Sequence, residues 1–189
     1  MIHPQHENEI PEHSYCHAAR GHEIHGSYHD REYGFPVEND DVLFERLVLE
    51  INQAGLSWLT ILRKRDGLRV AYDGFSIGRV ASYGEEDRAR LLDDARIIRN
   101  RLKVDAAISN AQAIQTLQAH YGSFAAWLDA HHPLDKPDWV KLFKKTFRFT
   151  GGEITGEFLM STGYLAGAHH PACPVYHQIT ALNPRWMQP

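Results

Sequence analysis

Two cysteines and two histidines are spaced so that they could bind one metal ion. Twelve residues separate Cys16 from His29, and three separate His169 from Cys173. Two cysteines and two histidines make up the ligand set of a tetrahedral structural zinc site. A metal bound by both pairs would join the N-terminal arm to the C-terminal segment. Four protein ligands leave no position for water, which argues against a catalytic zinc.

Spacing alone leaves other interpretations of these residues open. The chain has 13 histidines, so short spacings arise by chance, and Cys16 and Cys173 could be free thiols beside surface histidines. A disulfide is favoured by secretion, for which the sequence gives no sign. Further histidines compete as ligands, namely His13, His17, His22, His25 and His170.

A carboxylate, Glu50, lies on a predicted amphipathic helix. Between residues 41 and 55 the apolar side chains recur at spacings of one, three and four, which indicates a helix with one apolar stripe. Glu50 falls at the edge of that stripe, in a partly apolar setting. Asn39 and Asp40 offer caps at its start and Gly55 ends it, while Ser57 can cap a second helix through Trp58.

The remaining patterns predict an all-α fold in one compact unit. Helical periodicity covers residues 99–121, begins again at 139 and returns over 158–165, and strand-like alternation is scarce. The first 25 residues have little periodicity and resemble an irregular arm, and the residues after 171 resemble a tail. We therefore expect a flexible arm at 1–12, a helical domain with a zinc staple at 13–175 and a tail at 176–189.

Composition is that of a globular protein. The 189 residues are 43% hydrophobic, and no apolar run is long enough for a membrane span. The polar N-terminus lacks a signal-peptide stretch, so a cytoplasmic, bacterial-type location is the default expectation. A monomer is the default expectation for the oligomeric state. The net charge of −4 argues mildly against a DNA partner. Basic residues nevertheless gather at 63–69, 96–103 and 141–148, either as solvated helix faces or as one patch.

Several segments resemble one family in order along the chain. Residues 28–36, YHDREYGFP, resemble its signature YHDxEWGxP, and residues 49–58, LEINQAGLSW, resemble LExxQAGLSW. Residues 95–103, ARIIRNRLK, resemble GIIRNRxK and are followed by a matching Asn110 and Ala111, while the run from Lys144 to Phe149 resembles KKxxFKFxG. The chain is thereby identified as a divergent member of the 3-methyladenine DNA glycosylase I family, within the helix-hairpin-helix superfamily.

The resemblance implies a structural zinc and a DNA-repair activity. Family members hold zinc with Cys, His, His and Cys, which correspond here to Cys16, His29, His169 and Cys173. The implied reaction is hydrolysis of the N-glycosidic bond of 3-methyladenine in double-stranded alkylated DNA, the first step of base-excision repair. The base is extruded from the stack to be recognised. The sequence places no lysine clearly for Schiff-base chemistry, so we expect a monofunctional glycosylase.

The resemblance also assigns roles to individual residues. Glu50 would accept hydrogen bonds from the base edge and favour a cationic base, and Trp58 would stack on it. The predicted substrate contacts also include Tyr28 and Tyr33. The residues implied to contact DNA are Gly55 and Leu56 in a loop that fills the gap in the duplex, and Arg96, Arg99, Arg101 and Lys103 in the hairpin region.

The chain departs from the family pattern at several positions around the predicted pocket. The usual Cys-x-Trp reads Cys16-His17-Ala18, and Tyr33 stands where the motif has Trp. His25 replaces a Tyr, Ile51 a small Gly, and Arg96 the hairpin Gly. These changes predict a less aromatic pocket of different shape, with an altered substrate range or turnover.

Three other functions compete with the glycosylase. The lost aromatics favour a catalytically weak or inactive homologue that binds damaged DNA. A zinc-stabilised protein-interaction module would use the metal site alone. A metal hydrolase would use His29, Asp30 and Glu32, and it would lose activity on chelation while still folded.

Overall fold

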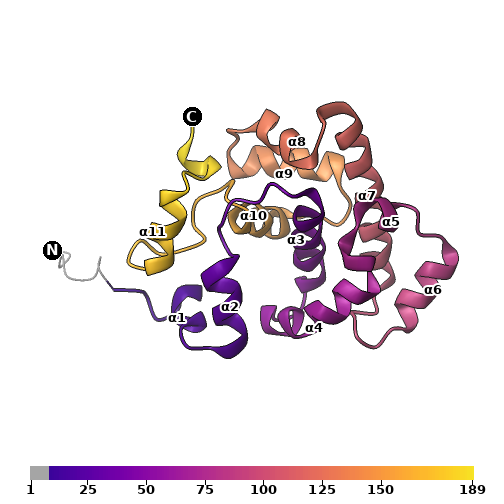
Figure 1. Cartoon of the computed structure of the whole chain (residues 1–189), viewed down its shortest axis with the longest axis horizontal. Helices are drawn as coiled ribbons and strands as arrows, with labels where there is room; N and C mark the ends of the chain where they lie inside the picture. The colour runs from indigo at the N-terminus through magenta and orange to yellow at the C-terminus, as the bar shows by residue number, and fades with distance from the viewer. Residues whose placement is uncertain (1–8) are drawn as a thin grey trace. The chain divides into compact units, whose positions relative to one another are not determined.

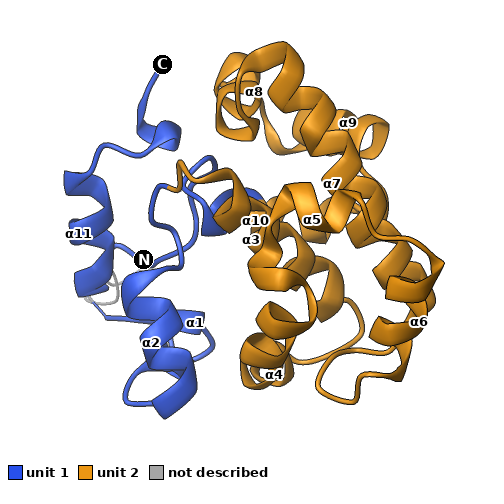
Figure 2. Ribbon diagram, turned by 45° about the vertical axis from the view of Figure 1, so that its right-hand side comes forward, with its two compact units in different colours: residues 1–36, 159–189 blue, residues 37–158 orange. Residues whose placement is uncertain are grey.

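The computed structural model describes residues 9–189 and is built from helices, with no strand within that range (Figure 1). This confirms the all-α prediction. The chain divides into two compact units (Figure 2). Unit 1 comprises residues 1–36 and 159–189, and unit 2 comprises residues 37–158. We expected a single helical domain over 13–175. Residues 1–8 of the expected N-terminal arm lie outside the described residues.

The helices alternate with short connections. Unit 1 contains α1 (Tyr15–Ala19), α2 (Glu23–Arg31), α11 (Pro174–Ala181) and the 3-10 turn η2 (Arg185–Met187). Unit 2 contains α3 (Asp40–Gln53), α4 (Trp58–Ala71), η1 (Asp73–Phe75), α5 (Ile77–Ala81), α6 (Glu85–Asp93), α7 (Arg101–Tyr121), α8 (Phe124–His131) and α9 (Lys136–Thr146). The chain passes from unit 2 into unit 1 within α10 (Gly152–Ser161). None of the described helices is long and apolar enough to span a membrane.

Helix α3 lies in the core of unit 2, as its apolar stripe predicts. Leu43, Phe44 and Leu47 are completely buried. The Asn39 side chain caps the helix by accepting a hydrogen bond from the backbone N–H of Val42 at 3.0 Å. The expected cap and the expected end near Gly55 are therefore both confirmed.

Helix α7 is the longest helix of the described chain and packs against α3, α5, α6 and α8 within unit 2. Its apolar face buries Val104, Ile108 and Ile114, as the periodicity over 99–121 predicts. Asn100 caps it through the backbone N–H of Lys103. Beyond Gly122, Asp40 accepts hydrogen bonds from the backbone N–H groups of Phe124 and Ala125, which fixes the start of α8.

Unit 1 contains helices where the sequence pattern shows no periodicity. Helix α1 and the start of α2 lie within the first 25 residues, where we expected little regular structure, and most of α11 lies in the tail expected at 176–189. These helices are short, so they bury too few apolar side chains to produce a readable stripe. These helices are held in place by contacts with one another and with the loops of unit 1.

A glycine lets two distant segments of unit 1 approach closely. Gly34 has φ +84°, and a Cβ at this position would lie 2.8 Å from the Cβ of Ala168. Its backbone N–H donates to the carbonyl of Ser161 at 2.9 Å. Any larger residue at Gly34 would push the segment after α2 away from residues 168–169.

Candidate functional site

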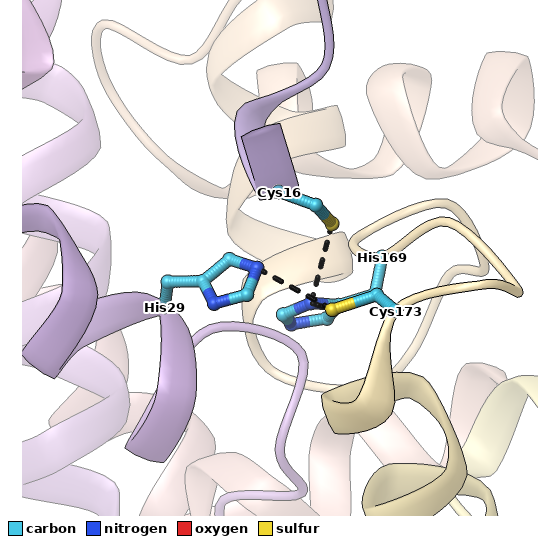
Figure 3. Close-up of side chains that lie close together, drawn as sticks. All are labelled: Cys16, His29, His169 and Cys173. Carbon is cyan, nitrogen blue, oxygen red and sulfur yellow. Dashed lines mark hydrogen bonds between the residues drawn. The ribbon is translucent and has the colours of Figure 1, made fainter. Parts of the chain in front are cut away.

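The four predicted metal ligands meet in unit 1. Cys16 lies on α1, His29 on α2, His169 in the loop after α10, and Cys173 at the N-cap of α11. All four are buried, with exposed fractions from 2% to 6%. The side chains point toward a common centre (Figure 3). Residues more than 130 positions apart in the sequence therefore converge, which spacing alone leaves open.

The distances between the ligand atoms fit a tetrahedral ion. Sγ of Cys16 lies 3.6 Å from Nδ1 of His169, and Sγ of Cys173 lies 3.8 Å from both Nδ1 of His169 and Nε2 of His29. All four ligand atoms lie within 4.8 Å of one another. A tetrahedral zinc ion with ordinary bond lengths separates its ligand atoms by about 3.4–3.8 Å. The cluster thus has the composition of a zinc site, and the three shortest distances are close to those around a tetrahedral ion.

The outer hydrogen bonds of both histidines turn the ligand nitrogens inward. Nδ1 of His29 is 2.6 Å from a carboxylate oxygen of Asp30, which leaves Nε2 for the centre. Nε2 of His169 is 2.7 Å from the carbonyl oxygen of Tyr33, which leaves Nδ1. Metal-binding histidines commonly donate their second N–H to a carboxylate or a carbonyl in this way. The two bonds fix which ring nitrogen faces the centre of the cluster.

The cysteines also fit a metal. The backbone N–H of His170 points at Sγ of Cys16 at 3.4 Å, an arrangement that favours a thiolate. Burial nevertheless raises the pKa of the Cys16 thiol to about 11. A buried thiol in this position stays protonated unless a cation compensates the charge, and a bound metal deprotonates its thiol ligands.

Aromatic rings surround the cluster. The rings of Tyr33 and His169 are 5.5 Å apart, and those of Tyr28 and Tyr33 are 5.8 Å apart. Tyr15, which the sequence analysis did not single out, packs edge-on against His25, His29 and Tyr33. The predicted substrate contacts Tyr28 and Tyr33 are 2% and 8% exposed, so most of each ring is engaged in packing.

Glu50 is buried in unit 2 and its carboxyl group is perturbed. It is 5% exposed on α3, deeper than its position at the stripe edge predicts. Burial and the nearby Glu157 raise its pKa to about 8, and this outweighs the attraction of Arg46 one turn earlier on α3. A carboxyl group shifted in this way is mostly protonated at neutral pH, and a cation placed against it would favour loss of the proton. Such groups are concentrated at functional sites.

Glu45, on the same helix, shows the opposite behaviour. Nε of Arg65 and Nε of Arg69 each lie 2.8 Å from its Oε1. Burial raises the pKa of Glu45, but the hydrogen bonds from both arginines outweigh this and hold it below its usual range. Two of the basic residues grouped at 63–69 are thus committed to an internal ion pair, so this cluster is not a plain solvated face.

The loop between α3 and α4 contains the predicted DNA contacts Gly55 and Leu56, and Trp58, predicted to stack on the base, follows it. Gly55 and Leu56 are exposed, and Gly55 has φ +80°. Ser57 caps α4 by accepting from the backbone N–H of Thr60 at 3.2 Å, as predicted. Trp58 is the first residue of α4 and is half-buried. An exposed, defined turn therefore precedes the predicted stacking residue.

The basic residues of the segment between α6 and α7 lie in different environments. Arg96 is exposed and bonded to Asp94 at 2.7 Å, and its hydrogen bonds lower the pKa of Asp94 to about 2. Arg99 is exposed, and the Arg101 guanidinium lies 3.8 Å from Asp105. Lys103 is different, because only 5% of it is exposed and its ammonium group is directed at backbone carbonyls.

Two structural residues help to explain the local sequence pattern. Asn110 on α7 pairs with the backbone of Arg148, accepting from its N–H at 2.7 Å and donating to its carbonyl at 3.1 Å. Gly67 on α4 faces Arg96, and a Cβ at Gly67 would lie 2.8 Å from the Arg96 Cβ. The absence of a side chain at Gly67 thus makes room for Arg96 in the segment between α6 and α7.

Comparisons with known proteins agree on one family. The methyladenine glycosylase family model matches residues 18–140. The chain is 34% identical to DNA-3-methyladenine glycosylase 1 of Escherichia coli K12, over 79% of this chain and 90% of the relative. It is 31% identical to DNA-3-methyladenine glycosylase of Haemophilus influenzae, over 80% of this chain and 91% of the relative.

A solved structure agrees with the sequence matches. A variant of 3-methyladenine DNA glycosylase I in complex with 3-methyladenine superimposes with a TM-score of 0.74. The two chains are 29% identical, and the match covers 83% of this chain and 95% of that one. Family model, sequence relatives and fold thus point in one direction. This chain belongs to the methyladenine glycosylase family.

Proposed function

We propose that this protein is a DNA glycosylase that hydrolyses the N-glycosidic bond of 3-methyladenine in alkylated DNA, as the first step of base-excision repair. The relatives carry this activity in their names, and a structural neighbour was solved with 3-methyladenine bound. The observation that carries the proposal is Glu50, a buried carboxyl group with a raised pKa inside the matched motif LExxQAGLSW.

The chemistry asks little of the protein at the leaving group. A 3-methyladenine base in DNA is cationic and departs without a strong general acid. The protein must recognise the damaged base and extrude it from the duplex. A damaged base costs less free energy to unstack than a base in a normal pair. The reaction therefore needs a site that prefers a cation and a device that fills the gap in the duplex.

Glu50 and Trp58 supply the preference for a cation in this proposal. A cationic base placed against Glu50 would stabilise the ionised carboxylate and restore its normal acidity. An aromatic face such as that of Trp58 attracts a cation by an amount on the order of 1–2 kcal/mol when water is excluded. Neutral adenine gains neither term, so it is rejected. The roles of Tyr28 and Tyr33 as further substrate contacts stay predictions from the resemblance.

The cluster of unit 1 holds a structural zinc in this proposal. Cys16, His29, His169 and Cys173 would complete the coordination of the ion, which would then bind no water and take no part in hydrolysis. Its bonds would tie α1 and α2 to the C-terminal helix α11. The distances between ligand atoms and the two outer hydrogen bonds of the histidines support this role.

The DNA partner would be held by two connections of unit 2. The loop between α3 and α4 offers the exposed Leu56 as a wedge, since apolar side chains can support unstacking of bases. The α6–loop–α7 segment is the candidate for the family's hairpin, with Arg96, Arg99 and Arg101 facing phosphates. We propose that the protein acts as a monomer on chromosomal DNA in a bacterial-type cytoplasm.

A weak or inactive homologue that binds damaged DNA is the second candidate. The specific observation behind it is the loss of aromatic residues at Ala18, His25 and Tyr33 relative to the family motif. Both candidates predict binding to alkylated duplex, so only release of the base separates them.

The test is direct measurement of free 3-methyladenine after incubation with methylated duplex DNA. Wild type is expected to release the base, and Glu50→Ala and Trp58→Ala are expected to release much less while keeping the wild-type helical content and metal stoichiometry. Neither substitution alters His29 or His169 of the candidate metal cluster. No release by folded, zinc-loaded wild type would overturn the enzyme and leave the DNA-binding homologue.

A further inference from the structure

Two connections of unit 2 that carry predicted DNA contacts are joined by a buried lysine. The wedge loop, residues 53–57, connects α3 to α4 and contains Gly55 and Leu56. The hairpin loop, residues 94–100, connects α6 to α7 and contains Arg96 and Arg99. Lys103 stands on the first turn of α7, directly after the hairpin loop.

The ammonium group of Lys103 closes the C-terminal end of α3. Its Nζ donates to the carbonyl of Asn52 at 2.8 Å and to the carbonyl of Ala54 at 2.7 Å. The last carbonyls of a helix lack partners within the helix, and they carry the negative end of its dipole. A lysine at this place satisfies two of them at once and fixes the point where the wedge loop begins.

The burial of Lys103 sets it apart from a phosphate ligand. Only 5% of the residue is exposed, and burial lowers its pKa below the usual value. Arg96 and Arg99 in the same region extend into solvent. The ammonium group of Lys103 is thus occupied by hydrogen bonds to the carbonyls at the end of α3.

The wedge loop has a defined shape beyond this anchor. The backbone N–H of Leu56 donates to the carbonyl of Gln53 at 2.7 Å, and the Gln53 side chain donates back to the carbonyl of Leu56 at 3.2 Å. Gly55 supplies the positive φ that the turn requires. The result is a tight turn that presents Leu56 at 38% exposure.

Helix α4, which follows the wedge loop, also contacts the hairpin loop. Nζ of Lys64 donates to the carbonyl of Ala95 at 2.9 Å. Gly67 allows the backbone of Arg96 to approach so closely that a Cβ on the glycine would lie 2.9 Å from the Arg96 carbonyl oxygen. The two loops are therefore linked both through Lys103 and through α4.

We propose that Lys103 is a positioning residue that holds the wedge loop in register with the hairpin loop, so that Leu56 enters the duplex while the hairpin loop grips the backbone. This rests on the proposed glycosylase function. Lys103 touches neither base nor phosphate, and it acts through Leu56. Its loss is expected to impair extrusion of the base, and to leave general affinity for duplex DNA in place.

The test uses Lys103→Met, which keeps the apolar stem and removes the ammonium group, and Lys103→Arg, which keeps a donor. Single-turnover release of 3-methyladenine should fall at least tenfold in the methionine variant and recover in part in the arginine variant. The fluorescence rise of 2-aminopurine beside the lesion, which reports unstacking, should fall with it. The Kd for undamaged duplex should stay within about twofold of wild type.

Arg90→Met is the matched control. Nη1 of Arg90 donates to the carbonyl of Ala71 at 2.8 Å, the same kind of bond to the last turn of a helix, but at the end of α4 that lies away from the wedge loop. This variant removes a charged side chain that donates to the end of a helix, and it should keep base release within about twofold. Equal losses of release in Lys103→Met and Arg90→Met would reduce Lys103 to general stability and overturn the proposal.

A double variant isolates the route through the wedge. If Lys103 acts by placing Leu56, then Lys103→Met should cost little further unstacking in a Leu56→Ala background. Additive losses, or a loss of duplex affinity equal to the loss of release, would contradict the positioning role. If folded wild type releases no base, the proposed function fails, while unstacking by wild type against Lys103→Met still decides the role of the lysine.

Discussion

The metal cluster of unit 1 and Glu50 of unit 2 are both buried polar centres, yet they are built in opposite ways. In the cluster, four side chains converge within 4.8 Å, and both histidines have outer partners that set their orientation. Glu50 is held where burial and a second carboxylate oppose its ionisation. The first arrangement is closed and has the ligand set of a possible metal site, whereas the raised pKa of Glu50 would favour a cation placed against it. We therefore expect the cluster to stabilise the fold and Glu50 to recognise the substrate.

Removal of the metal should have the largest effect on stability. We expect Cys173→Ser, or treatment with a strong chelator, to lower the stability of unit 1 by several kcal/mol, because structural zinc contributes folding free energy directly. Thermal unfolding and metal analysis measure the loss, and the two buried thiols should react with a thiol reagent only after chelation. His170→Ala is the control, since this neighbouring histidine lies outside the cluster. Full stability and unreactive thiols in metal-free protein would show that no ion holds this cluster.

The ion pair of Glu45 should come next, since it shows what a satisfied carboxylate contributes on α3. Glu45→Gln leaves Arg65 buried without its charge partner, and breaking such a pair costs about 3–5 kcal/mol. Urea unfolding measures this. Asp138→Asn serves as the exposed counterpart, because its pair with Lys141 at 2.7 Å is solvated and contributes little to stability. Equal losses in the two variants would refute the distinction.

Glu50 should make the free energy of unfolding fall as pH rises, the reverse of the effect of an ion-paired carboxylate. Its folded pKa of about 8 is above the unfolded value, so stability is highest below the unfolded pKa and declines as pH rises toward 8. Glu50→Gln cannot ionise, so it should gain stability over wild type above pH 8 and lose this advantage near pH 4. The free energy of unfolding measured from pH 4 to 9 gives both curves. Parallel curves would mean that Glu50 ionises normally.

The smallest expected effect concerns two arginines of the hairpin loop. Arg96 already pairs with Asp94, whereas Arg99 is exposed. We expect Arg99→Gln to reduce the salt dependence of duplex binding by about one phosphate contact, and Arg96→Gln to reduce it by less. Binding titrations over a range of salt concentrations measure this slope. A larger effect at Arg96 would show that it exchanges Asp94 for a phosphate.

The sequence predicts best where periodicity is long. Helices α3 and α7, the cap of α3 at Asn39 and the break near Gly55 follow from apolar spacing and cap chemistry. Helices α1, α2 and α11 escape prediction because each is only a few turns long and packs around polar ligands, so no apolar stripe marks it. Their order depends on long-range contacts that no local pattern shows.

In the candidate site, too, some features follow from the sequence and others appear only in the folded chain. Spacing leaves the metal ligands ambiguous among many histidines, and only the folded chain brings His29 and His169 to one centre while leaving His170 outside it. Charge alone groups Lys103 with exposed arginines, although its ammonium group is buried against α3. Tyr15 carries no motif and is found only by its packing.

One measurement tests the central claim that ionised Glu50 selects a cationic base. Single-turnover release of 3-methyladenine from a defined duplex is compared for wild type and Glu50→Gln, with the helical content and zinc content of both verified. A hydrogen bond to a charged group contributes about 1.5–3 kcal/mol, so the variant should release the base roughly 10- to 150-fold more slowly. Release by Glu50→Gln at the wild-type rate would contradict the account.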